Sequence, residues 1–211
     1  MTELVFILDR SGSMYGLERD TIGGFNSMLD KQRTRSGAAF VTTVLFNQER
    51  TFLHDRLPLE RVPNITEAQY TPVGGTALLD AVGSTIRHIA RIHKYARKED
   101  VPEKTLFVII TDGMENASRE YSYDRVKELI AHEQRKYGWE FLFLGANIDA
   151  AREGARFGIR PERAVTYKCD AEGTALNYDA VCEAVTELRA NRPLGSGWRS
   201  RIDADVKKRG K

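Results

Sequence analysis

The sequence predicts an α/β protein with a doubly wound, mostly parallel sheet of six strands, one of them an antiparallel edge strand, and helices on both faces. Short β-rich runs alternate with longer stretches in which apolar residues recur at helical spacing. The predicted strands at 3–8 and 105–111 contain uninterrupted apolar runs at 4–8 and 106–110, as expected of parallel strands that are covered on both faces. This alternation of strands and helices is typical of a doubly wound sheet.

The elements can be placed in order along the chain. Strands are expected at 3–8, 39–46, 50–54, 105–111, 139–145 and 163–167. Helices are expected around 22–29, 79–89, 126–130, 149–156 and 178–188. The strands at 39–46 and 50–54 are separated by too few residues for a crossover helix, so we expect them to pair antiparallel at one edge of the sheet.

The composition is that of an ordinary globular domain. The chain has 211 residues, of which 41% are hydrophobic and 29% are charged. This length predicts one domain, over residues 1–190. A basic tail at 191–211 follows, which we expect to be loosely ordered, although Trp198 could dock it.

The net charge and the cysteine content indicate which kinds of partner and which cellular compartment to expect. The chain has 32 basic and 30 acidic residues, a net charge of +2, which favours neither nucleic acid nor an anionic membrane as a partner. The apolar runs of five residues are far shorter than the roughly 20 that a membrane helix needs, and the N-terminal MTE lacks the basic start of a signal peptide. Cys169 and Cys182 have no CxxC spacing, so we expect reduced thiols and a cytoplasmic location.

Polar side chains follow the first predicted strand at alternate positions. Asp9, Ser11 and Ser13 stand at i, i+2 and i+4, so in a near-extended turn their oxygens point the same way. Gly12 permits a tight path between the two serines. Ligands of open parallel sheets bind beyond the carboxyl ends of the strands, which is where these side chains are expected.

Two further loops are expected at the same edge. A Gly-Gly turn leads to Thr76 at the start of a long helix, and Asp112 ends the strand at 105–111. Together the three loops offer two carboxylates and three hydroxyls, with no cysteine or histidine among them. This oxygen-only set suits Mg²⁺ or Mn²⁺ and does not suit zinc.

The order Asp-x-Ser-x-Ser, a distant Thr and a distant Asp resembles the metal ion-dependent adhesion site of von Willebrand factor A domains. The pattern falls on Asp9, Ser11, Ser13, Thr76 and Asp112, and the resemblance covers roughly residues 2–190. It implies a Rossmann-like fold and a Mg²⁺ held by the three hydroxyls. The two aspartates would act directly or through water, and one position would remain for an acidic side chain of a partner.

Each of these residues also has a purely structural interpretation. The serines could cap a helix, and Asp112 could simply form a turn. Glu115 and Asn116 follow Asp112 and could tune the site, but we expect surface roles for both, and we expect Asp149 to cap the short helix at 149–156. The basic stretch at 87–98 is expected to be a solvated helix face.

The known enzyme patterns fit poorly. A haloacid dehalogenase-like phosphatase needs a second aspartate where Ser11 stands, and neither a nucleophile elbow, a dinucleotide-binding glycine run nor a P-loop is present. A metal-assisted hydrolase acting on a phosphoester or nucleotide remains as the alternative, but no general base is evident. The sequence therefore predicts a non-enzymatic, Mg²⁺-dependent interaction module that binds an acidic residue of a protein partner, of unknown oligomeric state.

Overall fold

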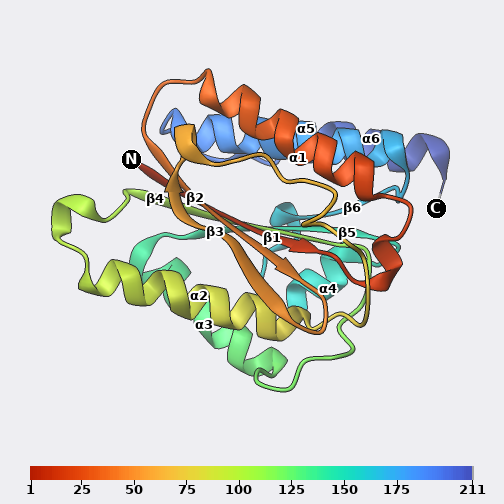
Figure 1. The fold of residues 1–211 in the computed structure, drawn as a ribbon, viewed down its shortest axis with the longest axis horizontal. Coiled ribbons are helices and arrows are strands. Elements are labelled where there is room, and N and C mark those ends of the chain that lie inside the picture. The colour runs from red at the N-terminus through yellow and green to blue at the C-terminus, as the bar shows by residue number, and fades with distance from the viewer. Residues whose placement is uncertain (211) are drawn as a thin grey trace.

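A six-stranded sheet forms the centre of the computed structural model, which describes residues 1–210 (Figure 1). The strands are β1 (Thr2–Asp9), β2 (Ala39–Phe46), β3 (Arg50–Pro58), β4 (Lys104–Thr111), β5 (Glu140–Ala146) and β6 (Ala164–Tyr167). Their order is β3-β2-β1-β4-β5-β6. The β2–β3 pair is antiparallel and every other pair is parallel, which confirms the predicted fold class.

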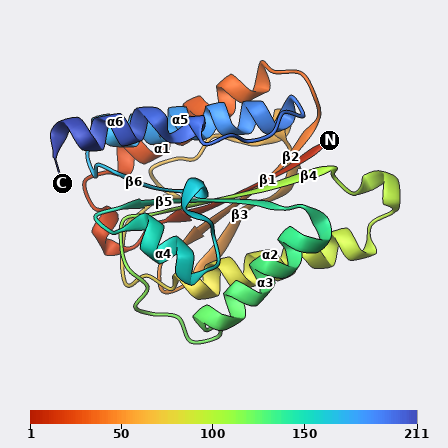
Figure 2. The same ribbon diagram turned by 180° about the vertical axis from the view of Figure 1, so that it is seen from behind.

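Helices cover both faces of the sheet, as Figures 1 and 2 show from opposite sides. One face carries α1 (Glu18–Arg33), α5 (Ala171–Arg189) and α6 (Ser200–Arg209). The other face carries α2 (Leu78–Tyr95), α3 (Tyr123–Tyr137) and α4 (Ala150–Arg156). Within residues 1–210, none of the helices has both the length and the apolar character needed to cross a membrane.

The core lies in two layers, one on each face of the sheet, and β1 contributes to both. Leu4, Phe6 and Leu8 pack in the layer under α1 and α5, whereas Val5 and Ile7 pack in the layer under α2 and α3. All five side chains are buried. This two-sided burial explains why the strand is apolar at every position from Leu4 to Leu8, because alternate side chains enter opposite layers.

The position of β1 creates the crevice in which a ligand can bind. From β1 the chain moves outward to β2 and β3 on one side, and then returns to β4, β5 and β6 on the other side. The connections after β1 and β4 therefore run to opposite faces of the sheet. Such a reversal leaves a crevice beyond the carboxyl ends of the two strands, and this is where open α/β sheets bind their ligands.

The C-terminal segment is folded onto the domain, so the prediction of a loosely ordered tail at 191–211 is wrong for residues 191–210. After a short turn at Gly197–Arg199, the chain forms α6. Leu194, Trp198 and Ile202 are buried in the layer on the α5 side of the sheet, and the indole Nε1 of Trp198 donates a hydrogen bond of 3.1 Å to the carbonyl oxygen of Glu162. Three apolar side chains in a basic segment are enough to anchor it.

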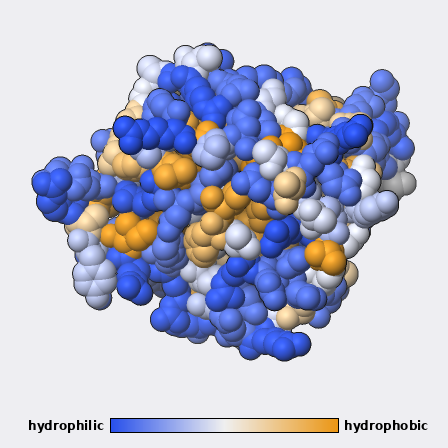
Figure 3. Space-filling view, viewed as in Figure 1, coloured by the Kyte–Doolittle hydropathy of each residue, from blue (hydrophilic) through white to orange (hydrophobic). Residues whose placement is uncertain are grey.

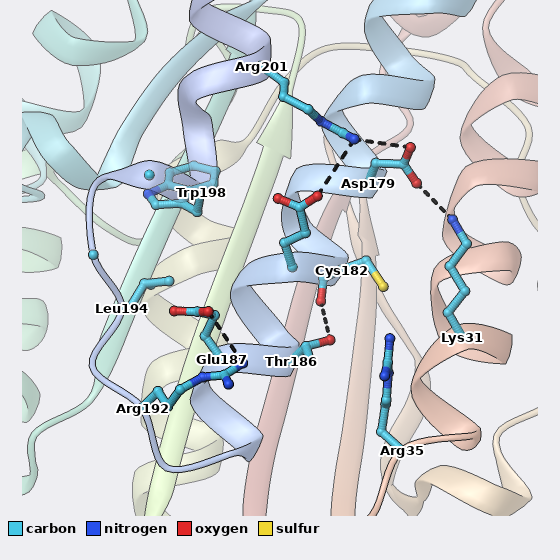
Figure 4. A pocket seen from close by; sticks show the side chains of 13 residues that line it. Lys31, Arg35, Asp179, Cys182, Thr186, Glu187, Arg192, Leu194, Trp198 and Arg201 are labelled. Atoms are coloured by element: carbon cyan, nitrogen blue, oxygen red, sulfur yellow. Dashed lines mark hydrogen bonds and ion pairs between the residues drawn. The ribbon is translucent and has the colours of Figure 1, made fainter.

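A cavity of about 610 Å³ separates part of this segment from α5 and α1 (Figure 4). Asp179 of α5 lies 2.8 Å from Lys31 of α1 and 3.3 Å from Arg201 of α6. Arg192 and Glu187 also form an ion pair, at 3.4 Å. These charged groups pair across the cavity, so they connect the C-terminal segment to α5 and α1.

The Trp198 contact gives a direct test of the folded tail. We expect Trp198→Ala to lower the free energy of unfolding by about 3–5 kcal/mol, because it removes a large buried side chain and leaves a cavity. Trp198→Phe keeps most of the packing and should lose much less. Urea denaturation measures both, and an unchanged midpoint in Trp198→Ala would show that the tail does not pack on the domain.

Candidate metal centre

Asp9, the last residue of β1, is held at the carboxyl edge of the sheet by hydrogen bonds to all of its oxygens. Its Oδ1 accepts from the backbone N–H of Ser11 at 2.7 Å, and its Oδ2 accepts from the hydroxyl of Thr111 at 2.6 Å. Its carbonyl oxygen accepts from the hydroxyl of Tyr70. The side chain is almost fully buried, and this burial raises the pKa of Asp9 to about 6.

A chain of hydrogen bonds joins the loop after β1 to the loop after β4. The hydroxyl oxygens of Ser11 and Ser13 lie 3.0 Å apart, and the Ser13 hydroxyl donates to Oδ1 of Asp112 at 2.5 Å. Ser11 is buried, whereas Ser13 is exposed, so the group opens to solvent at Ser13. Neither hydroxyl caps a helix, since Ser11 makes no side-chain capping bond and α1 begins only at Glu18.

The second carboxylate oxygen of Asp112 has no protein partner among residues 1–210. Oδ2 of Asp112 is buried and accepts no hydrogen bond, and desolvation raises the pKa of this carboxyl group. A buried carboxylate oxygen without a partner is unfavourable, because the charge has lost its water and has gained only part of the compensation. A cation bound at this point would satisfy it.

Thr76 faces the same space from the third loop. A Cβ built on Gly113 would lie 3.3 Å from the hydroxyl oxygens of both Ser13 and Thr76, so the two hydroxyls flank the space that a side chain at 113 would fill. No hydrogen bond of the Thr76 hydroxyl is found within the described part of the chain. The structure thus brings Asp9, Ser11, Ser13 and Asp112 into one hydrogen-bonded group, with Thr76 beside it.

Backbone hydrogen bonds fix the three loops relative to one another. The N–H of Asn116, in the loop after β4, donates to the carbonyl oxygen of Thr76 at 3.0 Å. The N–H of Gly12 donates to the carbonyl oxygen of Gly74, and that of Val73 donates to the carbonyl oxygen of Arg10, both at 3.0 Å. Gly74 has a positive φ of 77°, a conformation that favours glycine. The hydroxyl-bearing residues are therefore held by their loops before any ligand arrives.

Glu115 is half-buried and Asn116 is exposed, in line with the expected surface positions, and both side chains also bind neighbouring loops. The side-chain oxygen of Asn116 accepts from the N–H of Thr76 at 2.9 Å. The carboxylate of Glu115 accepts from the N–H of Leu79 in the first turn of α2, at 2.9 Å, and from the N–H and hydroxyl of Ser118, both at 2.7 Å. A carboxylate at a helix N-terminus satisfies its free N–H groups and its dipole.

Sequence reasoning missed two further residues of the site, Thr111 and Tyr70. Both contact Asp9, from 102 and 61 positions away along the chain. Thr111 is the last residue of β4, and it can bond to Asp9 because β1 and β4 are parallel neighbours. The only feature of the sequence that could have identified Thr111 as part of the site was its position at the end of a predicted strand. No feature of the sequence identified Tyr70.

The remaining sequence interpretations concern residues outside this group. Asp149 caps α4 as predicted, because its side chain accepts from the N–H of Arg152 at 3.0 Å. Cys169 and Cys182 are both free thiols, as expected. All four histidines lie within β3, α2 or α3, and not in the three loops of the site.

The donor set fits a hard divalent cation. It consists of two carboxylates and three hydroxyls, all oxygen, and oxygen ligands are those that Mg²⁺ and Mn²⁺ prefer. No three side chains of His, Cys, Asp or Glu gather around one point in residues 1–210, so a site rich in thiolate, imidazole or carboxylate ligands is not found there. Glu3 and Glu133 also have a buried carboxylate oxygen without a partner, but that of Asp112 belongs to the group that contains the serine hydroxyls, so it marks the point where a cation would bind.

Comparison with solved structures identifies the fold. A von Willebrand factor type A protein from Catenulispora acidiphila superposes over 88% of this chain with a TM-score of 0.56 and 15% identity. The chain has the fold of a von Willebrand factor type A domain. Proximal thread matrix protein 1 of the mussel byssus, with a zinc-occupied MIDAS motif, matches this domain over 88% of the chain with a TM-score of 0.60 and 14% identity.

The likeness to these domains is one of structure. A minor pilin, PilB from Streptococcus sanguinis, matches 91% of this chain with a TM-score of 0.57 and 11% identity. The chain spans 42%, 46% and 63% of the lengths of these three solved chains. No protein-family model matches the sequence, and no curated protein matches it either.

The space at Gly113 gives a test of the site. We expect Gly113→Ala to weaken the binding of Mg²⁺ tenfold or more, about 1.4 kcal/mol, because the added methyl group enters the space between the hydroxyls of Ser13 and Thr76. Gly23→Ala is the control, since a Cβ there contacts nothing within 4 Å. Isothermal titration with MgCl₂ measures both, and equal affinities would argue against a cation at this point.

Proposed function

We propose that the group at the carboxyl edge of the sheet binds Mg²⁺, with Mn²⁺ as an equivalent, and through it an acidic side chain of a partner protein. The unpartnered, buried Oδ2 of Asp112 carries this proposal, together with the hydroxyls of Ser11, Ser13 and Thr76 around it. When bound, the cation would supply a positive charge whose coordination shell a carboxylate from outside can complete.

The residues of this chain have distinct roles in the proposal. Ser11, Ser13 and Thr76 would present neutral hydroxyls, which reduce the charge of a cation less than carboxylates do. Asp9 already accepts hydrogen bonds with both carboxylate oxygens, so it orients the loop and contributes negative charge. Asp112 has one free oxygen, and the exposed Ser13 marks the side from which a partner would approach.

A binding role fits the site better than hydrolysis. A metal-assisted hydrolase needs a general base within hydrogen-bond reach of the attacking water. The four histidine side chains lie elsewhere: His54 contacts Thr43, and His88 and His93 contact Asp55 and Glu3. The ring of His132 lies against Tyr137 at the end of α3. The solved structures of the same fold include a byssus matrix protein with a zinc-occupied adhesion site, which supports a divalent cation and an interaction role.

The partner would be a protein, in the cytoplasm. The net charge of +2 gives no reason to expect nucleic acid or an anionic membrane. The two free cysteines support a reducing compartment. The identity of the partner lies outside these residues, since the site specifies only a carboxylate.

The dependence on the cation can be measured without the partner. We expect excess Mg²⁺ to stabilise the protein relative to EDTA, by about 2.7 kcal/mol at a hundredfold excess over the dissociation constant. Asp112→Asn and Ser13→Ala should lose this gain. Asp112→Asn should not destabilise the metal-free protein strongly, because it removes a buried charge.

Asp149→Asn is the matched control, because it removes a carboxylate at the same edge and keeps a good helix cap. Thermal melts with EDTA and with MgCl₂ give the comparison. The proposal fails if Asp112→Asn keeps the full Mg²⁺-dependent gain. Turnover of a phosphoester such as p-nitrophenyl phosphate that Asp112→Asn abolishes would favour the hydrolase instead.

A further inference from the structure

Few large hydrophobic side chains of the described residues are strongly exposed, and they are unevenly placed. The five are Tyr15 (83% exposed), Val73 (59%), Tyr95 (75%), Met114 (58%) and Tyr137 (54%). Tyr15, Val73 and Met114 lie one in each of the three loops that carry the hydroxyls and carboxylates of the site. We call these three residues the apolar collar. The other two end α2 and α3, at the opposite edge of the sheet.

The placement of the exposed apolar residues can be compared with the surface of one face of the molecule. Figure 3 shows one face of the molecule as mostly hydrophilic, with several apolar areas, the broadest of them near the middle of that face. Single exposed apolar residues are normal on a protein surface, but several around one polar site indicate an interaction surface. Each collar residue stands within three positions of a residue of the site: Tyr15 near Ser13, Met114 near Asp112 and Val73 near Thr76.

The loops hold the collar in place although its side chains are in solvent. The N–H of Tyr15 donates to the carbonyl oxygen of Gly12 at 3.2 Å, and that of Val73 donates to the carbonyl oxygen of Arg10 at 3.0 Å. Met14, next to Tyr15, is buried in the core, so the local fold buries one apolar residue and turns the next one outward. A rigid apolar surface loses little entropy when a partner covers it.

The apolar surface extends at the same edge toward β6. A hollow of about 420 Å³ lies after the carboxyl ends of β5 and β6, and its walls include Ile148, Tyr167, Cys169 and Val206. This volume has room for an apolar side chain. Val206 comes from α6, so the folded C-terminal segment forms part of this edge.

We propose that the partner presents its acidic residue flanked by apolar side chains, which pack on Tyr15, Val73 and Met114 while the carboxylate reaches the metal centre. This inference rests on the proposed function and specifies the chemistry of the partner. The apolar collar would exclude water around the ion contact, as the surroundings of interface hot spots do.

Arg119 and Lys168 at this edge form no ion pair among the described residues, but other cations near the collar are engaged within the protein, which favours a protein partner over an anionic lipid surface. Arg19 pairs with Glu67 at 3.4 Å, and Arg50 pairs with Glu120 at 3.0 Å, so these cations are already engaged. Arg10 donates to Thr51 and to the carbonyl oxygen of Gln69. A membrane-binding edge would instead present a cluster of free lysine and arginine side chains.

A phage-displayed library of short random peptides with one fixed aspartate tests the inference. We expect peptides selected with Mg²⁺ to carry aliphatic or aromatic residues beside the aspartate. Fluorescence anisotropy should show that Tyr15→Ser and Met114→Ser each weaken binding of a selected peptide about tenfold. Tyr95→Ser and Tyr137→Ser are matched controls and should not change it. All four side chains are exposed, so the fold should persist.

The outcomes separate the inference from the proposed function. Polar residues beside the aspartate, or equal binding by collar and control variants, would overturn the inference alone. Binding that needs neither Mg²⁺ nor Asp112, or no selected peptide at all, would overturn the proposed function and the inference with it. Collar-dependent binding to phosphatidylserine vesicles would show that the collar binds a membrane instead of a protein partner. Collar-dependent dimers in sedimentation equilibrium would show that it binds a second copy of this chain.

Discussion

The pairing of β1 with β4 is the constraint on which the rest of the structure depends. Leu8 lies opposite Ile110, so both strands end at the same level and Asp9 and Thr111 come within hydrogen-bond distance. The chain reaches β4 only after it has formed β2, β3 and α2, and this reversal opens the crevice between the loops. Because the strands are parallel and buried on both faces, their ends are rigid. The polar loops begin at these ends and are therefore held in place.

The loops of the site achieve their positions with hydrogen bonds and not with a hydrophobic core. Glu115 and Asn116 attach the loop after β4 to the start of α2, while Gly12 and Val73 attach the loops after β1 and β3 to each other. Glu3 and Glu133 also have a buried carboxylate oxygen without a partner, but the free oxygen of Asp112 belongs to a carboxylate that bonds to a hydroxyl of the site. The same rigid frame carries apolar side chains outward, so one edge combines a polar centre with an apolar surround.

The periodicity of the sequence was enough for most of the fold. The strand at 39–46 has the predicted limits, and the edge strand at 50–54 is longer than predicted, ending at Pro58. Its second half contains charged residues and a proline, which only an edge strand tolerates, so periodicity could not reveal it. The tail was misjudged because its composition is basic, although Leu194, Trp198 and Ile202 supply an apolar anchor.

The sequence by itself determined the order of the strands and of the helices up to residue 190, and it predicted the five residues of the candidate site. Both depend on patterns among residues that are close together in the sequence. Only the tertiary structure could decide which distant groups contact that site. Tyr70, Thr111 and Asn116 join it across 61, 102 and 40 positions. It also decided that Tyr15, Val73 and Met114 are exposed in the loops of the site, since exposure depends on packing that no single segment encodes.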